Sequence, residues 1–335
     1  MERPIDFVIT WVDGSDTAWQ AEKNRYLAVE KGGSIDAGAT RYRDWDNLKY
    51  WFRAVEKYAP WVNKVHFVTW GHVPQWLDPD APKLHIVRHE DFIPREYLPT
   101  FSSHPIELNL HRIEGLSEQF VYFNDDFFLT APVKPRDFFR KGLPCDSIAE
   151  EPIQFPAAEL YNHIRINDIV FLNRHFDRAK ARGQHPDKWF SLRAPHDCFK
   201  NLVMTLVRKP CFFGLNTQHL PQAYLKATYE EVWKLDPEQL HDTSTHCFRS
   251  ETDVSQCVLK FYQMMQGNFV PYNKHKAGTV LHPQRELDEI RNVIQSRSRK
   301  FLCINDSDVT DLEYCKCRIN DAFEKALPQR SAFEK

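Results

Sequence analysis

Two short acidic loops, each following an apolar strand-like segment, hold the side chains best suited to chemistry. The first segment is IDFVITWVDGSD at residues 5–16, and the second is FVYFNDDFFL at residues 120–129. Ligands of an open parallel sheet bind beyond the carboxyl ends of its strands, so carboxylates gathered there predict a site for a metal ion and an anionic substrate. A nucleotide diphosphate fits this chemistry.

A purely structural role is the alternative for each loop, because Asp and Asn are common in turns, where their side chains bond to nearby backbone. This alternative is weaker for Asp125 and Asp126. The pair lies between aromatic runs, and two like charges beside apolar side chains are costly without a cation. We therefore expect Asp125 and Asp126 to bind Mg²⁺ or Mn²⁺, with Asn124 orienting them.

Length and composition indicate an enzyme-sized globular protein. Of the 335 residues, 42% are hydrophobic and 13% aromatic, which excludes disorder and allows a large core. The formal net charge of −2 gives no global electrostatic reason to expect a nucleic-acid partner. No secretory leader is recognisable, and no apolar run approaches the ~18 to 20 residues that cross a bilayer. We expect a cytoplasmic protein, placed at the inner face of the membrane by peripheral association if its substrate is lipid-linked.

The eight cysteines are scattered, which in a chain of this size does not indicate a disulfide framework. Cys315 and Cys317, with Cys303 nearby, leave a zinc site open as an alternative. Their spacing, however, does not match the usual paired-ligand patterns. Reduced and mostly buried thiols are the expected state.

The N-terminal part of the chain alternates strand and helix, as in a doubly wound α/β sheet. Beyond the two strands already named, strands are expected over 64–70 and 84–87. Helices are expected over 44–58 and 105–116. Because such connections are nearly always right-handed, successive strands end at one edge, and the two acidic loops should share one crevice.

Seven prolines interrupt the pattern between residues 143 and 229, where we expect an irregular or helical insertion that keeps many aromatic side chains. Helices are expected again over 252–266, 283–295 and 318–327.

Four blocks of the sequence, in the same order, resemble the Stealth family of sugar-phosphate transferases. This family includes bacterial capsule and cell-wall polysaccharide phosphotransferases and the lysosomal-enzyme N-acetylglucosamine phosphotransferase of animals. The blocks are IDFVITWVDGSD, the stretch from RYRDWDNLKYWFRAVEKYAPWVNKVHFVTWG through FSSHPIELNLHRIEGLSEQFVYFNDDFFL, TQHLPQAYLK at 217–226, and KFLCINDSD at 300–308 with the trailing LPQRSAFEK. The second block is the most specific.

The resemblance implies a Rossmann-like core of the nucleotide-sugar transferase type with a family-specific insertion. On this basis we expect a nucleotide-sugar-binding α/β core over 1–140 and an insertion or second lobe with the histidine motif over 141–230. A mostly helical part over 231–335 is expected to complete the active site.

The implied reaction moves a sugar 1-phosphate from a nucleotide sugar, a UDP-hexose or UDP-N-acetylhexosamine, to a glycan hydroxyl. It forms a phosphodiester in a capsule or cell-surface polysaccharide and releases a nucleoside monophosphate. The residues alone leave two alternatives open: a metal-dependent glycosyltransferase that releases a nucleoside diphosphate, and a glycan-binding protein without activity. The chain lacks the additional modules of the animal relatives, so the expected acceptor is a glycan or a lipid-linked oligosaccharide.

The expected catalytic residues are Asp126, His219 and Arg249. His219 matches the third block, and its imidazole has a pKa suited to accepting a hydroxyl proton; a structural role is the alternative. Arg249 matches a family arginine whose guanidinium can bind the transferring phosphate in two places, with an ion pair to Glu251 or Asp253 as its alternative.

Further residues of the blocks are expected at the substrate. Asn305 and Asp306 in the fourth block should complete the metal or donor site, with a plain turn as the alternative. Asp13, Gly14 and Asp16 form a tight loop that could let the nucleotide approach the backbone. Arg41 and Arg43 are expected to contact phosphate, with a solvated surface position as the alternative.

Overall fold

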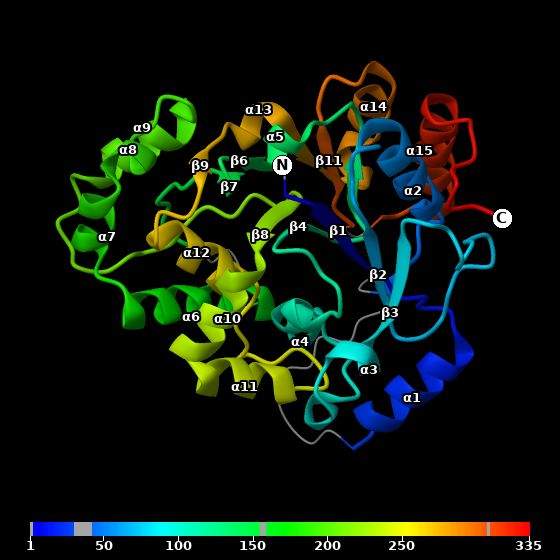
Figure 1. Cartoon of the computed structure of the whole chain (residues 1–335), viewed down its shortest axis with the longest axis horizontal. Helices are drawn as coiled ribbons and strands as arrows, with labels where there is room; N and C mark the ends of the chain where they lie inside the picture. The colour runs from blue at the N-terminus through cyan, green and yellow to red at the C-terminus, as the bar shows by residue number, and fades with distance from the viewer. Residues whose placement is uncertain (1–2, 30–41, 155–158, 307–308) are drawn as a thin grey trace.

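The computed structural model describes residues 3–29, 42–154, 159–306 and 309–335 (Figure 1). Arg41 lies outside these residues, so its predicted contact with phosphate stays a prediction. Within the described residues, no helix is both long enough and apolar enough to pass through a membrane.

The central sheet has five strands in the order β3-β2-β1-β4-β8. The first four are parallel, and β8 runs antiparallel to β4. The strand order reverses at β1, because β2 and β4 pair with its opposite edges, which confirms the doubly wound α/β class. The strand bounds are β1 Ile5–Thr10, β2 Val65–Thr69, β3 Leu84–Arg88, β4 Gln119–Phe123 and β8 Gln222–Leu225.

Hydrophobic cores cover both faces of this sheet. In β1, Phe7 and Ile9 face one core, whereas Val8 faces the other. In β4, Phe123 and Tyr122 divide in the same way. A strand that is buried on both faces is apolar throughout, which explains the uninterrupted hydrophobic runs in the sequence.

Helices form the outer layers (Figure 1). The first core is covered by α2 (Leu48–Tyr58), α14 (Pro283–Ser296) and α15 (Leu312–Ala326). The second core is covered by α4 (Ser103–Asn109), α10 (Lys226–Leu235), α11 (Pro237–Thr245) and α12 (Cys257–Met265). Shorter elements complete the layers: α1 Thr17–Leu27, α3 His89–Phe92 and the 3-10 turns η2 Arg95–Tyr97 and η3 Leu110–Arg112.

Two small sheets attach the later parts of the chain to the core. One has the order β10-β11-β5 and joins β5 (Phe127–Leu129), directly after the second acidic loop, to β11 (Phe301–Ile304). β10 (Gly278–Leu281) is its third strand. The other has the order β6-β7-β9, with bounds Phe139–Arg140, Leu143–Asp146 and Val270–Pro271, and lies near the short helices α5 Pro135–Phe138 and α13 Lys274–Ala277.

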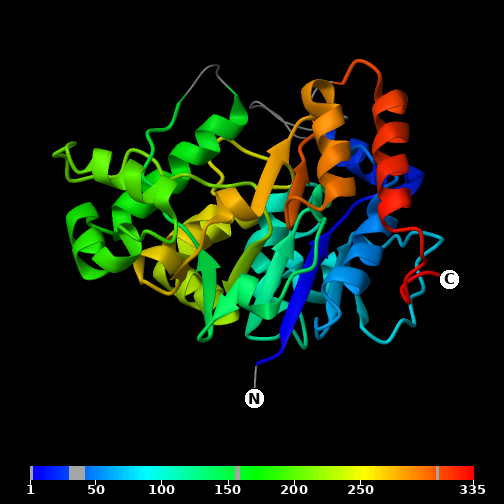
Figure 2. The same ribbon diagram turned by 90° about the horizontal axis from the view of Figure 1, so that it is seen from above.

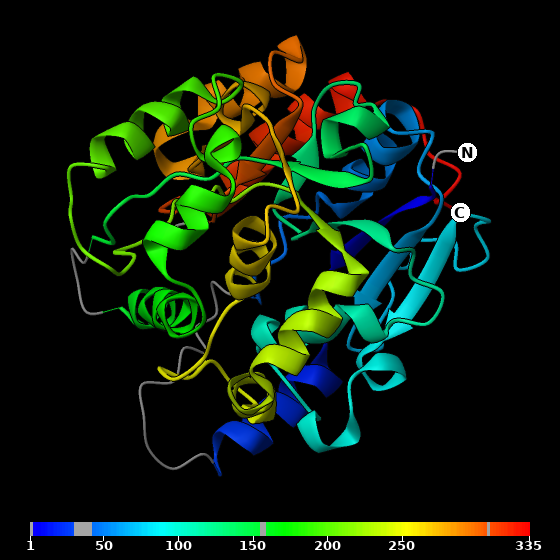
Figure 3. The ribbon, with the colours of Figure 1, turned by 60° about the vertical axis from the view of Figure 1, so that its left-hand side comes forward.

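A helical lobe extends from one end of the molecule, opposite the paired helices α14 and α15 (Figures 1 and 2). It contains α6 (Leu160–His175), α7 (Arg178–Gln184), α8 (Pro186–Trp189) and α9 (Pro195–Met204), and Figure 3 brings this side forward. Its own core includes the buried rings of Trp189, Phe212 and Phe269.

The predicted helices need several corrections. The helix expected from residue 44 begins at 48, and the one expected over 105–116 ends at Asn109, where a 3-10 turn follows. The region expected to be irregular or helical contains four helices, because Pro186 and Pro195 occupy first-turn positions, where the missing N–H is not needed, and so begin helices instead of interrupting them.

The predicted division at residues 140 and 230 stays a prediction. The structure shows that residues 222–225, inside the range expected for the lobe, form β8 at the edge of the central sheet. The C-terminal part contributes β9, β10 and β11 in addition to its helices.

Candidate functional site

The pairing of β1 with β4 brings the two acidic loops together. In this parallel pair Ile9 lies opposite Phe123, so the residues after each strand emerge side by side. A cleft of about 170 Å³ opens at this point. Trp11 and Val12 of the first loop line it, as do Asn124 and Asp125 of the second, so both loops border one crevice as the sequence predicted.

Four carboxylates from distant parts of the chain act on one another beside this cleft. Desolvation, reinforced by the charges of Asp126, Asp44 and Asp306, raises the pKa of Asp125 to about 7. Desolvation and neighbouring charges that include Asp13 also raise the pKa of Asp44. Negative charge therefore accumulates at the end of β4, the arrangement expected of a site that binds a cation.

The fourth block reaches this cluster through the small sheet. Cys303 of β11 lies opposite Phe127 of β5, and the Ile304 N–H donates to the Asp126 carbonyl oxygen at 2.9 Å. This pairing places Asn305 and Asp306 beside the second acidic loop. The Arg43 Nη1 atom lies 3.3 Å from Asp306 Oδ1, so the structure assigns Arg43 a carboxylate contact at the border of the site.

Asp126 joins the second acidic loop to His219. Its Oδ2 atom lies 3.3 Å from His219 Nε2 and accepts a hydrogen bond of 3.3 Å from the Cys303 thiol. Desolvation lowers the pKa of His219, but the charge and hydrogen bond of Asp126 outweigh this and leave the pKa raised. The His219 side chain is 46% exposed and its ring packs edge-on against Phe127. The imidazole is thus oriented and still accessible to a substrate.

Two oxygen atoms at this site are buried without a hydrogen-bond partner among the described residues. They are Asn124 Oδ1 and Asp126 Oδ1. Leaving a buried acceptor unpaired costs on the order of 1 to 3 kcal/mol, so such atoms are rare unless a ligand satisfies them. Hard cations take oxygen ligands of this kind, so the residues present fit Mg²⁺ or Mn²⁺.

Arg249 lines the same cleft as Asn124 and Asp125. Its Nη2 atom donates to Ser103 Oγ at 3.0 Å, which directs the guanidinium towards α4. Asp253, one of the partners considered for Arg249, is instead bound by His104 Nδ1 at 2.9 Å and His246 Nδ1 at 2.6 Å. Because Arg249 lines the cleft, its guanidinium is placed where it can bind an anion.

The first acidic loop has structural roles besides its place at the cleft. Asp16 caps α1 by accepting from the Trp19 N–H at 2.8 Å, and Asp13 Oδ1 accepts from the Ser15 N–H at 2.8 Å. A Cβ atom on Gly14 would lie 1.9 Å from the Tyr42 carbonyl oxygen. Glycine is needed there so that the Tyr42 backbone, which also borders the cleft, can approach. Donor contacts of these residues stay a prediction.

Sequence analysis missed Asp44, Glu107 and the contact of Cys303 with Asp126. Glu107 lines the cleft, is only 5% exposed and accepts from the Tyr122 hydroxyl at 3.0 Å. The available signal was the single acid in the mostly apolar stretch PIELNL. A glutamate is rarely buried unless it is paired, so an acid at this position indicates a specific contact. Asp44 follows Arg43 directly in the second block, and that proximity was its signal.

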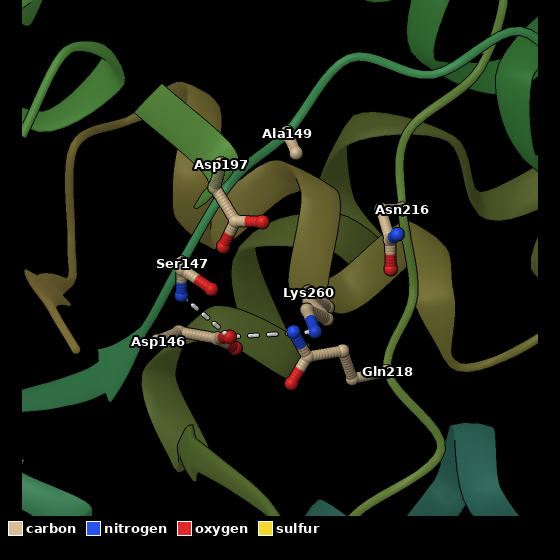
Figure 4. Close-up of a pocket in the computed structure, with 7 residues that line it drawn as sticks. All are labelled: Asp146, Ser147, Ala149, Asp197, Asn216, Gln218 and Lys260. Atoms are coloured by element: carbon tan, nitrogen blue, oxygen red, sulfur yellow. Dashed lines mark hydrogen bonds and ion pairs between the residues drawn. The ribbon is translucent and has the colours of Figure 1, made fainter. Parts of the chain in front are cut away.

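A second pocket lies between α9 of the lobe and the residues of β7 and α12, and has almost no free volume (Figure 4). Asp146, Lys260 and Asp197 point into it. The His275 Nε2 atom lies 2.9 Å from Asp197 Oδ1. Desolvation alone would raise the pKa of Asp197, but hydrogen bonds from His275, Ser147 and His196 outweigh it and lower this pKa to about 2. These ion pairs account for the grouping of His196, Asp197 and His275.

The cysteines are less buried than expected. Of the eight, four are buried, namely Cys145, Cys198, Cys303 and Cys315, and their reduced state stays a prediction. Among the described residues, the two groups of side chains close enough to share a metal ion include neither Cys315 nor Cys317.

Repulsion at the carboxylate cluster gives a stability prediction. The raised pKa of Asp125 means that its ionisation destabilises the folded state, with an effect that grows from pH 4 and is complete above pH 7. In the absence of divalent cations at pH 8, Asp125→Asn should increase the free energy of unfolding by about 0.5 to 1 kcal/mol, since water at the exposed side of Asp125 screens the repulsion. Urea denaturation measures this change.

The difference should disappear below pH 4, where the wild-type carboxyl is also neutral. Asp80→Asn, on an exposed loop away from the cleft, is the matched control and should change stability little. A loss of stability in Asp125→Asn at pH 8 would contradict the predicted repulsion.

Comparison with known proteins identifies the family of this chain. Models of the Stealth family match conserved region 1 over residues 3–28 and conserved region 2 over residues 41–145. The capsular polysaccharide phosphotransferase WcwK of Streptococcus pneumoniae is 39% identical over the whole of both chains. The receptor polysaccharide phosphotransferase WefC of Streptococcus oralis is 39% identical over 98% of this chain and 99% of its own. The exopolysaccharide phosphotransferase cps2G of Lactiplantibacillus plantarum is 36% identical over 99% and 96% of the two chains.

Among solved structures, this chain is similar to the galactosyltransferase LgtC in complex with donor and acceptor sugar analogues. The match covers 96% of this chain and 95% of LgtC at 9% identity, and its TM-score of 0.38 is too low to support an argument. The full-length similarity to the phosphotransferases does support one. This chain belongs to the Stealth family of polysaccharide phosphotransferases.

Proposed function

We propose that this enzyme transfers a sugar 1-phosphate from a nucleotide sugar, a UDP-hexose or UDP-N-acetylhexosamine, to a hydroxyl of a capsular or cell-surface glycan. The acceptor is a free glycan or a lipid-linked oligosaccharide. One observation carries the proposal: Asp125 of the carboxylate cluster, the neighbouring Asn124 and Arg249 line the same cleft where the strand order reverses. A cation site facing an anion-binding side chain suits a diphosphate.

In this reaction the acceptor oxygen attacks the phosphorus that bears the sugar. A new phosphorus–oxygen bond forms, and the phosphoanhydride bond breaks. The nucleoside monophosphate leaves with the bonding electron pair, and the hydroxyl proton passes to a base. Such displacements depend on positioning and on stabilisation of the phosphate charge.

Asn124, Asp125 and Asp126 would hold Mg²⁺ or Mn²⁺, and Asn305 and Asp306 would complete the site. When bound, the cation would neutralise the charge of the diphosphate and of the leaving group. The unpaired Asn124 and Asp126 oxygens and the mutual repulsion of the carboxylates support this assignment.

His219 is the base that takes the proton of the acceptor hydroxyl. When Nε2–H donates to Asp126, the lone pair of Nδ1 is available to accept that proton. The Asp126 carboxylate then stabilises the imidazolium that forms, in keeping with the raised pKa of His219. Arg249 binds the transferring phosphate from the α4 side of the cleft.

The released nucleotide tests the reaction type directly. Incubation with a panel of nucleotide sugars and cell-surface glycans should release a nucleoside monophosphate, measured by chromatography, in proportion to the phosphodiester formed. A control without acceptor corrects for hydrolysis of the donor. Release of a nucleoside diphosphate would overturn the proposal and identify the enzyme as a glycosyltransferase.

Asp126→Asn should abolish turnover, because it removes the charge that binds the cation and orients His219. The amide keeps the volume of the carboxylate, so the free energy of unfolding without cation should change by less than about 1 kcal/mol, or about 1 to 2 °C in Tm for a chain of this length. Mg²⁺ or Mn²⁺ should raise the Tm of the wild type and of the Asp80→Asn control, but not that of Asp126→Asn. Full turnover of the wild type in excess EDTA would contradict the cation requirement.

His219→Ala should lower turnover by about 10² to 10⁴-fold, the usual contribution of a positioned base. Donor affinity, measured by calorimetry, should change little because the cation and Arg249 hold the donor. His163→Ala, which removes an exposed histidine of α6, is the matched control. If His219→Ala loses donor affinity together with turnover, His219 binds the donor and a strand-end aspartate becomes the base.

A further inference from the structure

Exposed apolar side chains gather on one short part of the helical lobe. Of the thirteen large hydrophobic side chains exposed among the described residues, six lie between residues 192 and 213. Leu192 is 85% exposed and Leu206 is 80% exposed. A concentration of this kind marks a binding surface, whereas single exposed apolar residues need no explanation. We call the four of these residues that share one side of α9 and the turn after it the apolar face: Phe199, Leu202, Val203 and Leu206.

The apolar face follows the helical period. Its members at positions 199, 202, 203 and 206 are spaced three and four residues apart, which places them on one side of α9 and the turn that follows it. The opposite side of α9 is buried against the lobe by a separate set, namely Asp197, Cys198, Asn201 and Met204. The outer stripe therefore takes no part in packing against the described residues of the lobe.

Polar contacts fix α9 in this orientation. The Asn201 amide donates to the Ile148 carbonyl at 2.8 Å and to the Trp189 carbonyl at 2.7 Å. The Arg178 guanidinium donates to the carbonyls of Met204 at 2.6 Å and Val207 at 2.7 Å. These buried bonds hold the helix and the turn after it, so the apolar face is presented rigidly to solvent.

Within residues 191–213 the exposed charged side chains are positive, and Glu151 beside α9 is paired with Lys200 at 2.6 Å. Arg193 precedes α9, and Arg208 and Lys209 follow it; all three are exposed. Asp197 is the sole acidic residue between 191 and 213, and it is 3% exposed and bound to His275. An apolar stripe flanked by basic side chains complements a bilayer interface, which offers acyl chains beneath anionic headgroups.

We propose that the apolar face binds reversibly to a lipid bilayer that contains anionic phospholipid. A second copy of the chain is the less suitable occupant. A twofold contact through this face would bring Arg193, Arg208 and Lys209 of both copies together, and that repulsion opposes pairing. The bilayer supplies the opposite charge instead.

Vesicle binding tests the proposal with the full chain and needs neither donor nor turnover. The wild type should sediment with phosphatidylcholine vesicles that contain phosphatidylglycerol, and less with phosphatidylcholine alone. Phe199→Ser combined with Leu206→Ser should lower the partition coefficient by about tenfold, since two apolar side chains leave the lipid. The matched control, Leu235→Ser combined with Tyr314→Ser, removes exposed apolar groups elsewhere and should bind as the wild type does.

A triple change, Arg193→Gln with Arg208→Gln and Lys209→Gln, should remove the preference for phosphatidylglycerol. Both variant sets should keep normal turnover with a water-soluble acceptor, so a failure of membrane binding and a failure of the proposed reaction are distinguishable. Equal vesicle binding by the wild type and Phe199→Ser/Leu206→Ser would overturn the proposal. A second outcome would also overturn it: the wild type does not bind vesicles and is a dimer by light scattering, and Phe199→Ser/Leu206→Ser is a monomer.

Discussion

The parallel pairing of β1 with β4 is the constraint on which the site depends. This pair brings a strand near the beginning of the chain next to one that ends more than a hundred residues later, and both are followed by acidic loops. The connections from β1 lead to opposite edges of the sheet, and a crevice is expected at such a junction. A cleft is left there, bordered by Trp11, Asn124 and Asp125.

The closely placed carboxylates of the site lower the stability of the folded state. Carboxylates at positions 44, 125, 126 and 306 are held close enough that Asp125 resists ionisation. The nearby positive charge of Arg43 contacts Asp306 and offsets part of the repulsion. Folding tolerates the remainder because two well-packed cores enclose the central sheet. Strained electrostatics of this kind are typical of catalytic sites, where a ligand relieves the repulsion.

The candidate site and the apolar face lie in different parts of the molecule. The core supplies the carboxylates, and the segment just before β8 supplies His219, so the proposed base comes from a segment that is anchored in the central sheet. The lobe, in contrast, fixes α9 through buried polar contacts and leaves apolar and basic side chains outside. A membrane contact there would hold the enzyme near a lipid-linked acceptor without involving the catalytic residues.

The sequence by itself determined the class of the fold and the local character of the site. Apolar runs predicted β1, β2, β3 and β4, and the acidic loops after β1 and β4 predicted where a ligand binds, because these signals arise from residues adjacent in the chain. Only the tertiary structure decided that Asp44 and Glu107 border the site and that Asp126 contacts both His219 and Cys303. These contacts join residues up to 177 positions apart, and they depend on sheet register and on antiparallel pairing of β5 with β11, which no local periodicity records. The first-turn prolines of the lobe helices were misread for a related reason, since a proline interrupts or begins a helix according to where that helix packs.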